Sequence, residues 1–171
     1  MNSQDESGSE THAGVADFSI YRAESPEQIA DARELFLEYA ASLGFSLCFQ
    51  NFDQELETLP GNYALPHGRL LLAQYHAELA GCVALRRIDA EIAEMKRLYL
   101  RPKFRGKGLG QIIAEKIIHE AQIIGYQRMR LDTVGPVMRS AVSMYGKLGF
   151  YQIAPYTKNP MQGALYMELK L

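Results

Sequence analysis

The 171-residue chain contains only two cysteines, Cys48 and Cys82, and only four histidines. Two cysteines cannot form a disulfide framework, and their spacing does not match a zinc site. The histidines also lack the spacing of metal ligands, so we expect no metal cofactor. Cys82 lies in an apolar, strand-like segment, which favours a buried structural thiol and a reducing cytoplasm as the compartment.

Long apolar runs are missing as well. No run approaches the roughly eighteen apolar residues of a membrane span, so we expect no membrane partner. Residues 1–17 lack the basic start and apolar centre of a signal peptide and are rich in Ser, Gly, Asp and Glu. We expect a disordered tail there, followed by a single domain over residues 18–171. The net charge of -2 gives no indication of a nucleic-acid partner.

The most informative stretch combines glycines and cations between an apolar run and a helix-periodic segment. It reads Arg105-Gly106-Lys107-Gly108-Leu109-Gly110. Glycines let the backbone approach a ligand closely, and a helix N-terminus adds partial positive charge. With Arg101 and Lys103, four cations lie within seven residues of a mildly acidic chain. The stretch therefore predicts an anion-binding loop.

Two common phosphate loops do not match this stretch. A Walker loop needs G-x-x-x-x-G-K-[ST], which occurs nowhere in the chain. A dinucleotide fingerprint needs G-x-G-x-x-G early in a βαβ unit, whereas Gly106, Gly108 and Gly110 are spaced G-x-G-x-G well past mid-chain. We therefore expect neither a P-loop nor a Rossmann fold.

Hydrophobic periodicity and turn residues predict an alternation of strands and helices. The expected strands are 18–22, 69–75, 79–87, 92–100, 128–134, 150–154 and 165–171. The expected helices are 26–42, a short piece at 53–58, 109–124 and 138–148. The strands from 69 to 100 form an antiparallel meander. Because a helix crossover precedes it, strand 128–134 should lie parallel to strand 92–100.

Two motifs together carry a family resemblance. Arg105, Gly108 and Gly110 fit R-x-x-G-x-G, and residues 141–150 read A-V-S-M-Y-G-K-L-G-F. Both motifs, and the element order over residues 18–171, resemble the GNAT superfamily of N-acetyltransferases. The resemblance implies an α/β three-layer sandwich on a mixed, mostly antiparallel sheet with a splayed parallel strand pair.

The resemblance also implies acetyl-CoA as cosubstrate. The loop Arg105, Gly106, Lys107, Gly108, Leu109 and Gly110 would bind its pyrophosphate. Leu98 and Leu100 occupy the strand-end positions at which the family pairs its backbone with the pantetheine arm. One position departs from the pattern, because Met138 stands where many members have an asparagine. Arg139 or Ser140 is a candidate to replace that contact.

Two residues are candidates for catalysis. In the family, a tyrosine at the position of Tyr145 protonates or hydrogen-bonds the departing thiolate; the alternative is a tyrosine that only packs in the core. Glu94 is the best-placed base for the amine, whose ordinary pKa near 10.4 leaves about one molecule in a thousand neutral at pH 7. The alternative for Glu94 is a surface carboxylate that faces Lys96 or Arg97.

Aromatic residues are candidates for the wall of an acceptor pocket, where they would hold an amine by cation–π contact. They are Tyr39, Phe45, Phe49, Tyr63 and Tyr156. The alternative is that they form ordinary core. The acceptor itself, a small molecule or a peptide amine, is not specified by any motif.

The sequence therefore predicts an N-acetyltransferase in which the amine attacks acetyl-CoA directly in a ternary complex. No candidate Cys or Ser for a covalent intermediate stands beside a base in sequence, which disfavours an acetyl-enzyme. Two alternatives stay open: a non-catalytic acyl-CoA sensor on the same fold, and a nucleic-acid binder that uses the basic loop. The latter is disfavoured by glycines where base-contacting side chains would be needed. The resemblance is also compatible with a homodimer.

Overall fold

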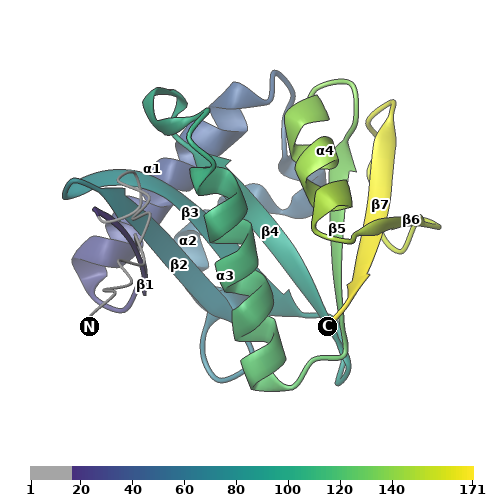
Figure 1. Ribbon diagram of the computed structural model, residues 1–171, viewed down its shortest axis with the longest axis horizontal. Helices are drawn as coiled ribbons and strands as arrows, with labels where there is room; N and C mark the ends of the chain where they lie inside the picture. The colour runs from purple at the N-terminus through teal and green to yellow at the C-terminus, as the bar shows by residue number, and fades with distance from the viewer. Residues whose placement is uncertain (1–16) are drawn as a thin grey trace, which may run out of the picture.

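The computed structural model describes residues 17–171 (Figure 1). The tail expected over residues 1–17 falls, apart from Asp17, outside the described residues. The strands are β1 (Phe18–Arg22), β2 (Arg69–Tyr75), β3 (Glu78–Arg87), β4 (Ile92–Leu100), β5 (Arg128–Val134), β6 (Tyr151–Ile153) and β7 (Ala164–Lys170). The α-helices are α1 (Pro26–Ser42), α2 (Phe52–Thr58), α3 (Leu109–Ile124) and α4 (Arg139–Lys147).

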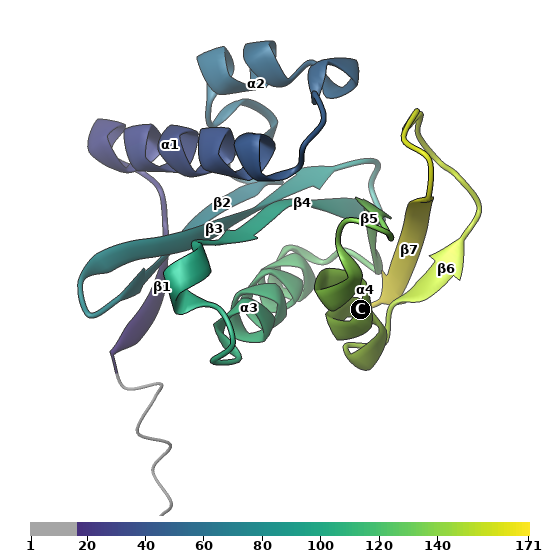
Figure 2. The same cartoon turned by 90° about the horizontal axis from the view of Figure 1, so that it is seen from above.

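The strands form one mixed sheet in the order β1-β2-β3-β4-β5-β7-β6. All neighbouring strands pair antiparallel except β4 and β5, which are parallel as predicted. Helices α1 and α2 cover one face of the sheet, and α3 and α4 cover the other (Figure 2). The predicted three-layer α/β sandwich is confirmed, and the element boundaries agree with the predicted ones to within one residue.

Local signals explain where the helices begin and end. Ser25 caps α1 through a capping box: its hydroxyl accepts a hydrogen bond from the backbone of Gln28, and the Gln28 side chain accepts one from the backbone of Ser25. Pro26 then occupies the first turn, where its missing N–H costs nothing. Gly125 ends α3 in the left-handed conformation, with φ of 102°.

Each helical layer has its own core. On one face, Ile113 and Ile117 of α3 pack with Leu85 and Met95 of the sheet. On the other, Leu35 and Phe36 of α1 pack with Leu72 and Tyr99. Cys82 is fully buried in this second core, and burial raises the pKa of its thiol, as expected for a structural cysteine. No helix among residues 17–171 has both the length and the apolar character that crossing a membrane requires.

Strand β4 contains the irregularity that shapes the centre of the molecule. Opposite β3 its register shifts between Lys96 and Tyr99, and Arg97 there has a left-handed φ of 58°. Its pairing with β5 covers only Ile92 to Glu94, after which the two strands diverge (Figure 1). The bulge and the divergence together open the sheet in its middle.

Candidate functional site

The opening between β4 and β5 contains a narrow cavity of about 30 Å³. Among its lining residues are Lys96 and Leu98 from β4, Asp132 from β5 and Tyr145 from α4. The cavity shares Leu98 and Met138 with a larger groove of about 430 Å³ that runs past Leu100 to Arg105. A continuous surface therefore leads from the centre of the sheet to the glycine loop before α3.

The glycine loop is built to leave backbone N–H groups free. Gly106 and Gly108 have left-handed φ values of 78° and 75°, which glycine adopts without strain. Helix α3 begins after Gly108 with no side-chain cap and no acidic residue in its first turn. A Cβ on Gly110 would meet nothing within 4 Å. The backbone at the start of α3 is therefore open to the approach of a ligand, and the helix N-terminus favours a negatively charged one.

Two of the four cations predicted to serve this loop have other partners. Arg101 donates to Glu38 of α1 at 3.0 and 2.7 Å, and Lys103 forms an ion pair with Glu78. The carboxylates come from distant parts of the sequence, so the local cation count overstated the charge. Arg105 and Lys107 have no carboxylate partner among the described residues, and Arg105 hydrogen-bonds the Leu100 carbonyl at 2.8 Å.

Tyr145 occupies the inner end of the narrow cavity. Its ring packs edge-on against Phe150 with centroids 5.6 Å apart, and the residue is only 6% exposed. Burial raises the pKa of its hydroxyl, so this group stays protonated at neutral pH. Among residues 17–171 its hydroxyl has no hydrogen-bond partner, which leaves the O–H free for a ligand in the cavity.

Glu94 is a buried residue with both oxygens engaged. It is 1% exposed, Arg86 donates its Nε to one oxygen at 2.5 Å, and the Tyr156 hydroxyl donates to the other at 2.9 Å. The alternative of a surface carboxylate facing Lys96 or Arg97 is therefore wrong. Arg86 lies directly opposite Glu94 in the β3–β4 register, so counting along the hairpin would have found this pair.

Arg97 connects the β4 bulge to helix α2. Its side chain is 2% exposed, and it donates to both oxygens of Glu55, at 3.1 and 2.6 Å. Burial works against its charge, but Glu55 outweighs that effect and raises the pKa of the guanidinium above its ordinary value. Tyr63 donates a further hydrogen bond to Glu55. Forty-two residues separate the two partners, so no local pattern could have revealed this pair.

Two further charged residues of the opening were not singled out from the sequence. Lys96 Nζ donates to Gln50 at 3.0 Å and lies 3.7 Å from Asp132. Burial lowers the pKa of Lys96 from its ordinary value. Asp132 accepts a hydrogen bond from Asn159 at 3.0 Å and lines the same cavity as Tyr145. The parallel pairing of β4 and β5, which is a long-range feature, brings these two residues together.

Comparison with known proteins agrees with this geometry. The model of the acetyltransferase (GNAT) family matches residues 29–150. An uncharacterized N-acetyltransferase of Schizosaccharomyces pombe is 37% identical over 91% of this chain and 96% of its own length. The chain belongs to the GNAT family. It is therefore an acyltransferase of the N-acetyltransferase type.

Solved structures show the same GNAT fold. An acetyltransferase from Streptococcus agalactiae superposes with a TM-score of 0.70, at 24% identity, over 91% of this chain and 99% of the other. A GNAT acetyltransferase from Elizabethkingia anophelis with acetyl-CoA bound gives a TM-score of 0.64 at 20% identity, over 91% and 99%. These similarities extend over the three layers described above.

The GNAT fold of this chain departs from the common pattern at Met138. Met138 lines both the narrow cavity and the larger groove, and its sulfur accepts a hydrogen bond from Thr133 at 3.2 Å. Arg139 and Ser140, the candidates to replace the usual asparagine, both line the groove.

Most of the aromatic residues expected in the acceptor pocket of this GNAT chain lie in the core instead. Tyr39, Phe45, Phe49 and Tyr63 all belong to the cluster on the α1 face, although Tyr39, Phe49 and Tyr63 also present an edge to a cavity. Tyr156 packs edge-on against Tyr166 and hydrogen-bonds Glu94. The ordinary-core alternative therefore describes most of this set.

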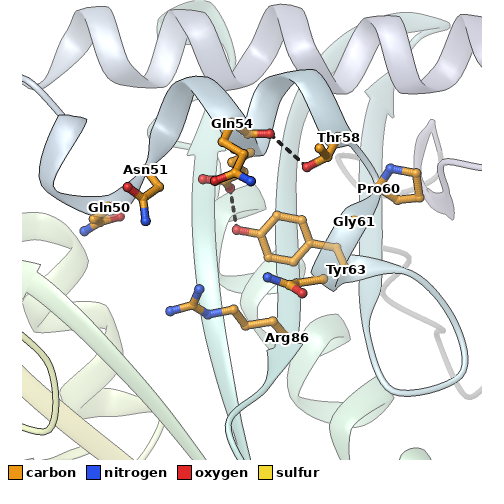
Figure 3. A pocket seen from close by; sticks show the side chains of 10 residues that line it. Gln50, Asn51, Gln54, Thr58, Pro60, Gly61, Tyr63 and Arg86 are labelled. Carbon is orange, nitrogen blue, oxygen red and sulfur yellow. Dashed lines mark hydrogen bonds between the residues drawn. The ribbon is translucent and has the colours of Figure 1, made fainter.

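On the α2 side, a polar cleft takes the place of an aromatic wall (Figure 3). It has a volume of about 300 Å³ and is lined by amide side chains, Glu55, Tyr63 and Arg86. Within residues 17–171 no group of three or more His, Cys, Asp or Glu side chains is arranged to hold a metal ion.

Proposed function

We propose that this GNAT protein transfers the acetyl group of acetyl-CoA to the amine of a small molecule, by direct attack in a ternary complex. One observation carries the proposal. The groove from the uncapped glycine loop leads into the β4–β5 opening, where the free Tyr145 hydroxyl lies. A smaller lobe of the polar cleft on the α2 side is lined by Lys96 and Arg97, and the same two residues line the opening. Two ligands can therefore meet there from opposite faces of the sheet.

The residues of the groove fit acetyl-CoA. The backbone from Arg105 to Gly110 and the N-terminus of α3 would hold its pyrophosphate, with Arg105 and Lys107 as local cations. The β4 strand beyond Glu94 has no β5 partner, so an extended arm with amide groups could pair with its backbone at Leu98 and Leu100, where Arg105 already occupies the Leu100 carbonyl. When bound, acetyl-CoA supplies the activated acetyl group.

Tyr145 is assigned the role of hydrogen-bond donor to the leaving sulfur. Its buried hydroxyl keeps its proton at neutral pH and has no partner within the described part of the chain. When the C–N bond forms and the C–S bond breaks, the sulfur gains negative charge. A donor already in place stabilises that charge without reorganisation.

Glu94 is assigned the role of proton acceptor for the amine. The Tyr156 hydroxyl, which donates to Glu94 at 2.9 Å, provides a route: it can pass its own proton to Glu94 as it accepts one from the amine. Asp132 is the competing carboxylate, because it lines the opening itself. The two assignments predict different results on mutation of Glu94 and Asp132.

The test is the release of free thiol from acetyl-CoA by the purified protein, with a panel of amines, amino acids and peptides. The proposal predicts release that depends on the amine, and fractionation of the pool then identifies the acceptor. If the protein binds acetyl-CoA but releases thiol with no member of the panel, the result contradicts the proposal and favours the acyl-CoA sensor.

A further inference from the structure

The cleft on the α2 side is lined by more cations than carboxylates. Its two lobes, of about 300 and 200 Å³, share Gln50, Asn51, Glu55 and Arg86 and so form one continuous space. The charged side chains along both lobes are four cations and one carboxylate. They are Arg86, Lys96, Arg97, Lys158 and Glu55. A cleft meant only for a cationic amine would have the opposite balance.

Two of these cations are already neutralised inside the protein. Arg97 is paired with both oxygens of Glu55, and Lys96 lies between Gln50 and Asp132. Arg86 is also paired, with Glu94, but through its Nε alone. Lys158 is exposed at the mouth of the smaller lobe and has no ion pair among the described residues.

Only one of the three guanidinium nitrogens of Arg86 has a hydrogen-bond partner among the described residues. Its Nε donates to Glu94 at 2.5 Å, and its side chain is 36% exposed. No acceptor among residues 17–171 contacts its two terminal nitrogens. In Figure 3 the guanidinium of Arg86 extends along the cleft beneath the Tyr63 ring, with no dashed line to any residue drawn. Because Glu94 is itself fixed by Tyr156, the orientation of this guanidinium is set before any ligand arrives.

We propose that Arg86 and Lys158 bind a carboxylate of the acceptor, which makes the acceptor a small amino carboxylate such as an amino acid. The planar guanidinium offers paired N–H donors that match the two oxygens of a carboxylate. Lys158 adds a second charge from the facing loop, and the neighbouring amides Gln50 and Asn51 suit polar ligand atoms. The smaller lobe reaches the β4–β5 opening through Lys96 and Arg97, so an amine one or a few bonds from the carboxylate can extend toward Tyr145.

This inference rests on the proposed function, and its test uses matched pairs of acceptors. Each pair is an amino acid and its carboxamide, which share the amine and differ in charge at the carboxyl carbon. The measured quantity is the ratio of kcat/KM for the acid to that for the amide. Comparing this ratio between wild type and variants cancels the intrinsic difference in amine reactivity within a pair.

Arg86→Met should lower the acid-to-amide ratio about 10- to 100-fold, because a charged bidentate contact is lost. Arg86→Lys should recover only part of the ratio, since the charge stays but the paired donors do not. Lys158→Met, which leaves Glu94 and its partner intact, should lower the ratio about two- to fivefold. Arg87→Met is the matched control: Arg87 is exposed on the next position of β3 and should leave the ratio unchanged.

Binding is measured separately by calorimetric titration with the N-acetylated acid and the N-acetylated amide, which need no turnover. We expect the wild type to bind the acid more tightly than the amide, Arg86→Met to lose that preference and Lys158→Met to weaken it. Equal acid-to-amide ratios in wild type, Arg86→Met and Lys158→Met would overturn the carboxylate site, as would tighter binding of the amide. If the enzyme acetylates neither member of any pair, that result contradicts the proposed function instead. The titration with the N-acetylated acid and amide then tests whether Arg86 and Lys158 bind a carboxylate.

Discussion

At the scale of single residues, Tyr145 and Glu94 approach the opening in the sheet from opposite faces. Tyr145 packs in the core beneath α3 and α4, together with Ala93 and Met95 of β4. Side chains alternate along a strand, so Glu94 points to the face covered by α1 and α2. The proposed donor and the proposed base therefore lie on opposite sides of the sheet and would act together only through the β4–β5 opening. This separation lets the effect of each be measured independently.

The variant Tyr145→Phe removes one hydroxyl and keeps the ring contact with Phe150. We expect kcat to fall about 100-fold, because the leaving sulfur loses its donor, while the KM for acetyl-CoA changes by less than about twofold. Steady-state kinetics measure both. Tyr151→Phe, at an exposed tyrosine, serves as the control. Wild-type turnover in Tyr145→Phe would remove the donor role.

The variant Glu94→Gln should move the pH dependence of kcat to higher pH. Without its proton acceptor, the enzyme depends on amine molecules that are already neutral, and their fraction rises toward the amine pKa. Activity at pH 7 should fall about 100-fold and recover in part as the pH rises. The same profile measured for Asp132→Asn separates the two carboxylates. If Asp132→Asn shows the shift and Glu94→Gln does not, the base is Asp132.

At the scale of elements, the junction of the glycine loop and α3 is the part most easily tested alone. Gly108 combines an open backbone with a left-handed φ of 75°, so Gly108→Val both strains the loop and blocks the approach of a ligand. Gly110 is the cleaner position, because a Cβ there meets nothing in the protein and no unusual φ is involved.

We therefore expect Gly110→Ala to weaken acetyl-CoA binding about tenfold while the melting temperature stays the same or rises, since alanine favours a helix. Calorimetry measures the affinity, and a thermal melt measures stability. Gly146→Ala, in α4 with equally open space around it, is the matched control and should leave the affinity unchanged. If Gly110→Ala and Gly108→Val each bind acetyl-CoA as tightly as the wild type, the loop is not part of the binding site.

The connection between α2 and the β4 bulge gives a stability prediction. Glu55→Ala leaves the buried Arg97 guanidinium without its partner, at a cost of about 3–5 kcal/mol. For a domain of this size the melting temperature should fall by roughly 10 °C. The control Glu34→Ala removes an exposed partner of Arg101 and should cost less than about 1 kcal/mol. Equal melting temperatures for the two variants would contradict the structural role of the pair.

The elements themselves could largely be predicted from the sequence, and the contacts between them could not. Ser25, Pro26 and Gly125 mark helix ends through local chemistry, and the loop before α3 is recognisable from its glycines. The bulge at Arg97 has no local signal, because Glu55, 42 residues away, stabilises it. For the same reason the cations at 101 and 103 were assigned to the loop, although they pair with carboxylates on α1 and β3.

At the scale of the whole molecule, titration of paired and buried groups sets the pH range of stability. Burial opposes ionisation of Glu120, but hydrogen bonds from Lys116 and Arg69 outweigh it and lower its pKa below the ordinary value of 4.5. At the other end of the range, burial raises the pKa of Tyr39 from 10.0 to about 12.

The signs follow from proton linkage. A carboxylate with a lowered folded pKa stabilises the protein above its unfolded pKa, and this contribution is lost as the pH falls below about 4.5. A tyrosine with a raised folded pKa costs stability once the unfolded chain ionises, so stability falls as the pH rises above about 10. We expect melting temperatures to decline at both ends, and Glu120→Gln to flatten the acid decline. An acid decline of equal size in Glu120→Gln would contradict the role of this carboxylate.

The larger groove and the smaller lobe of the polar cleft each share lining residues with the narrow cavity between β4 and β5. In the proposed mechanism both substrates are bound at once, and no covalent acetyl-enzyme forms. Direct passage of the acetyl group from acetyl-CoA to the amine is thus the central feature of the proposed mechanism.

The most direct test is to incubate the protein with acetyl-CoA labelled in its acetyl group, with and without an accepted amine, and to weigh protein and amine by mass spectrometry. We predict that the label appears on the amine only, and that the protein mass stays unchanged in both samples. A labelled protein in the absence of amine, or an amine that never acquires the label, would contradict the account.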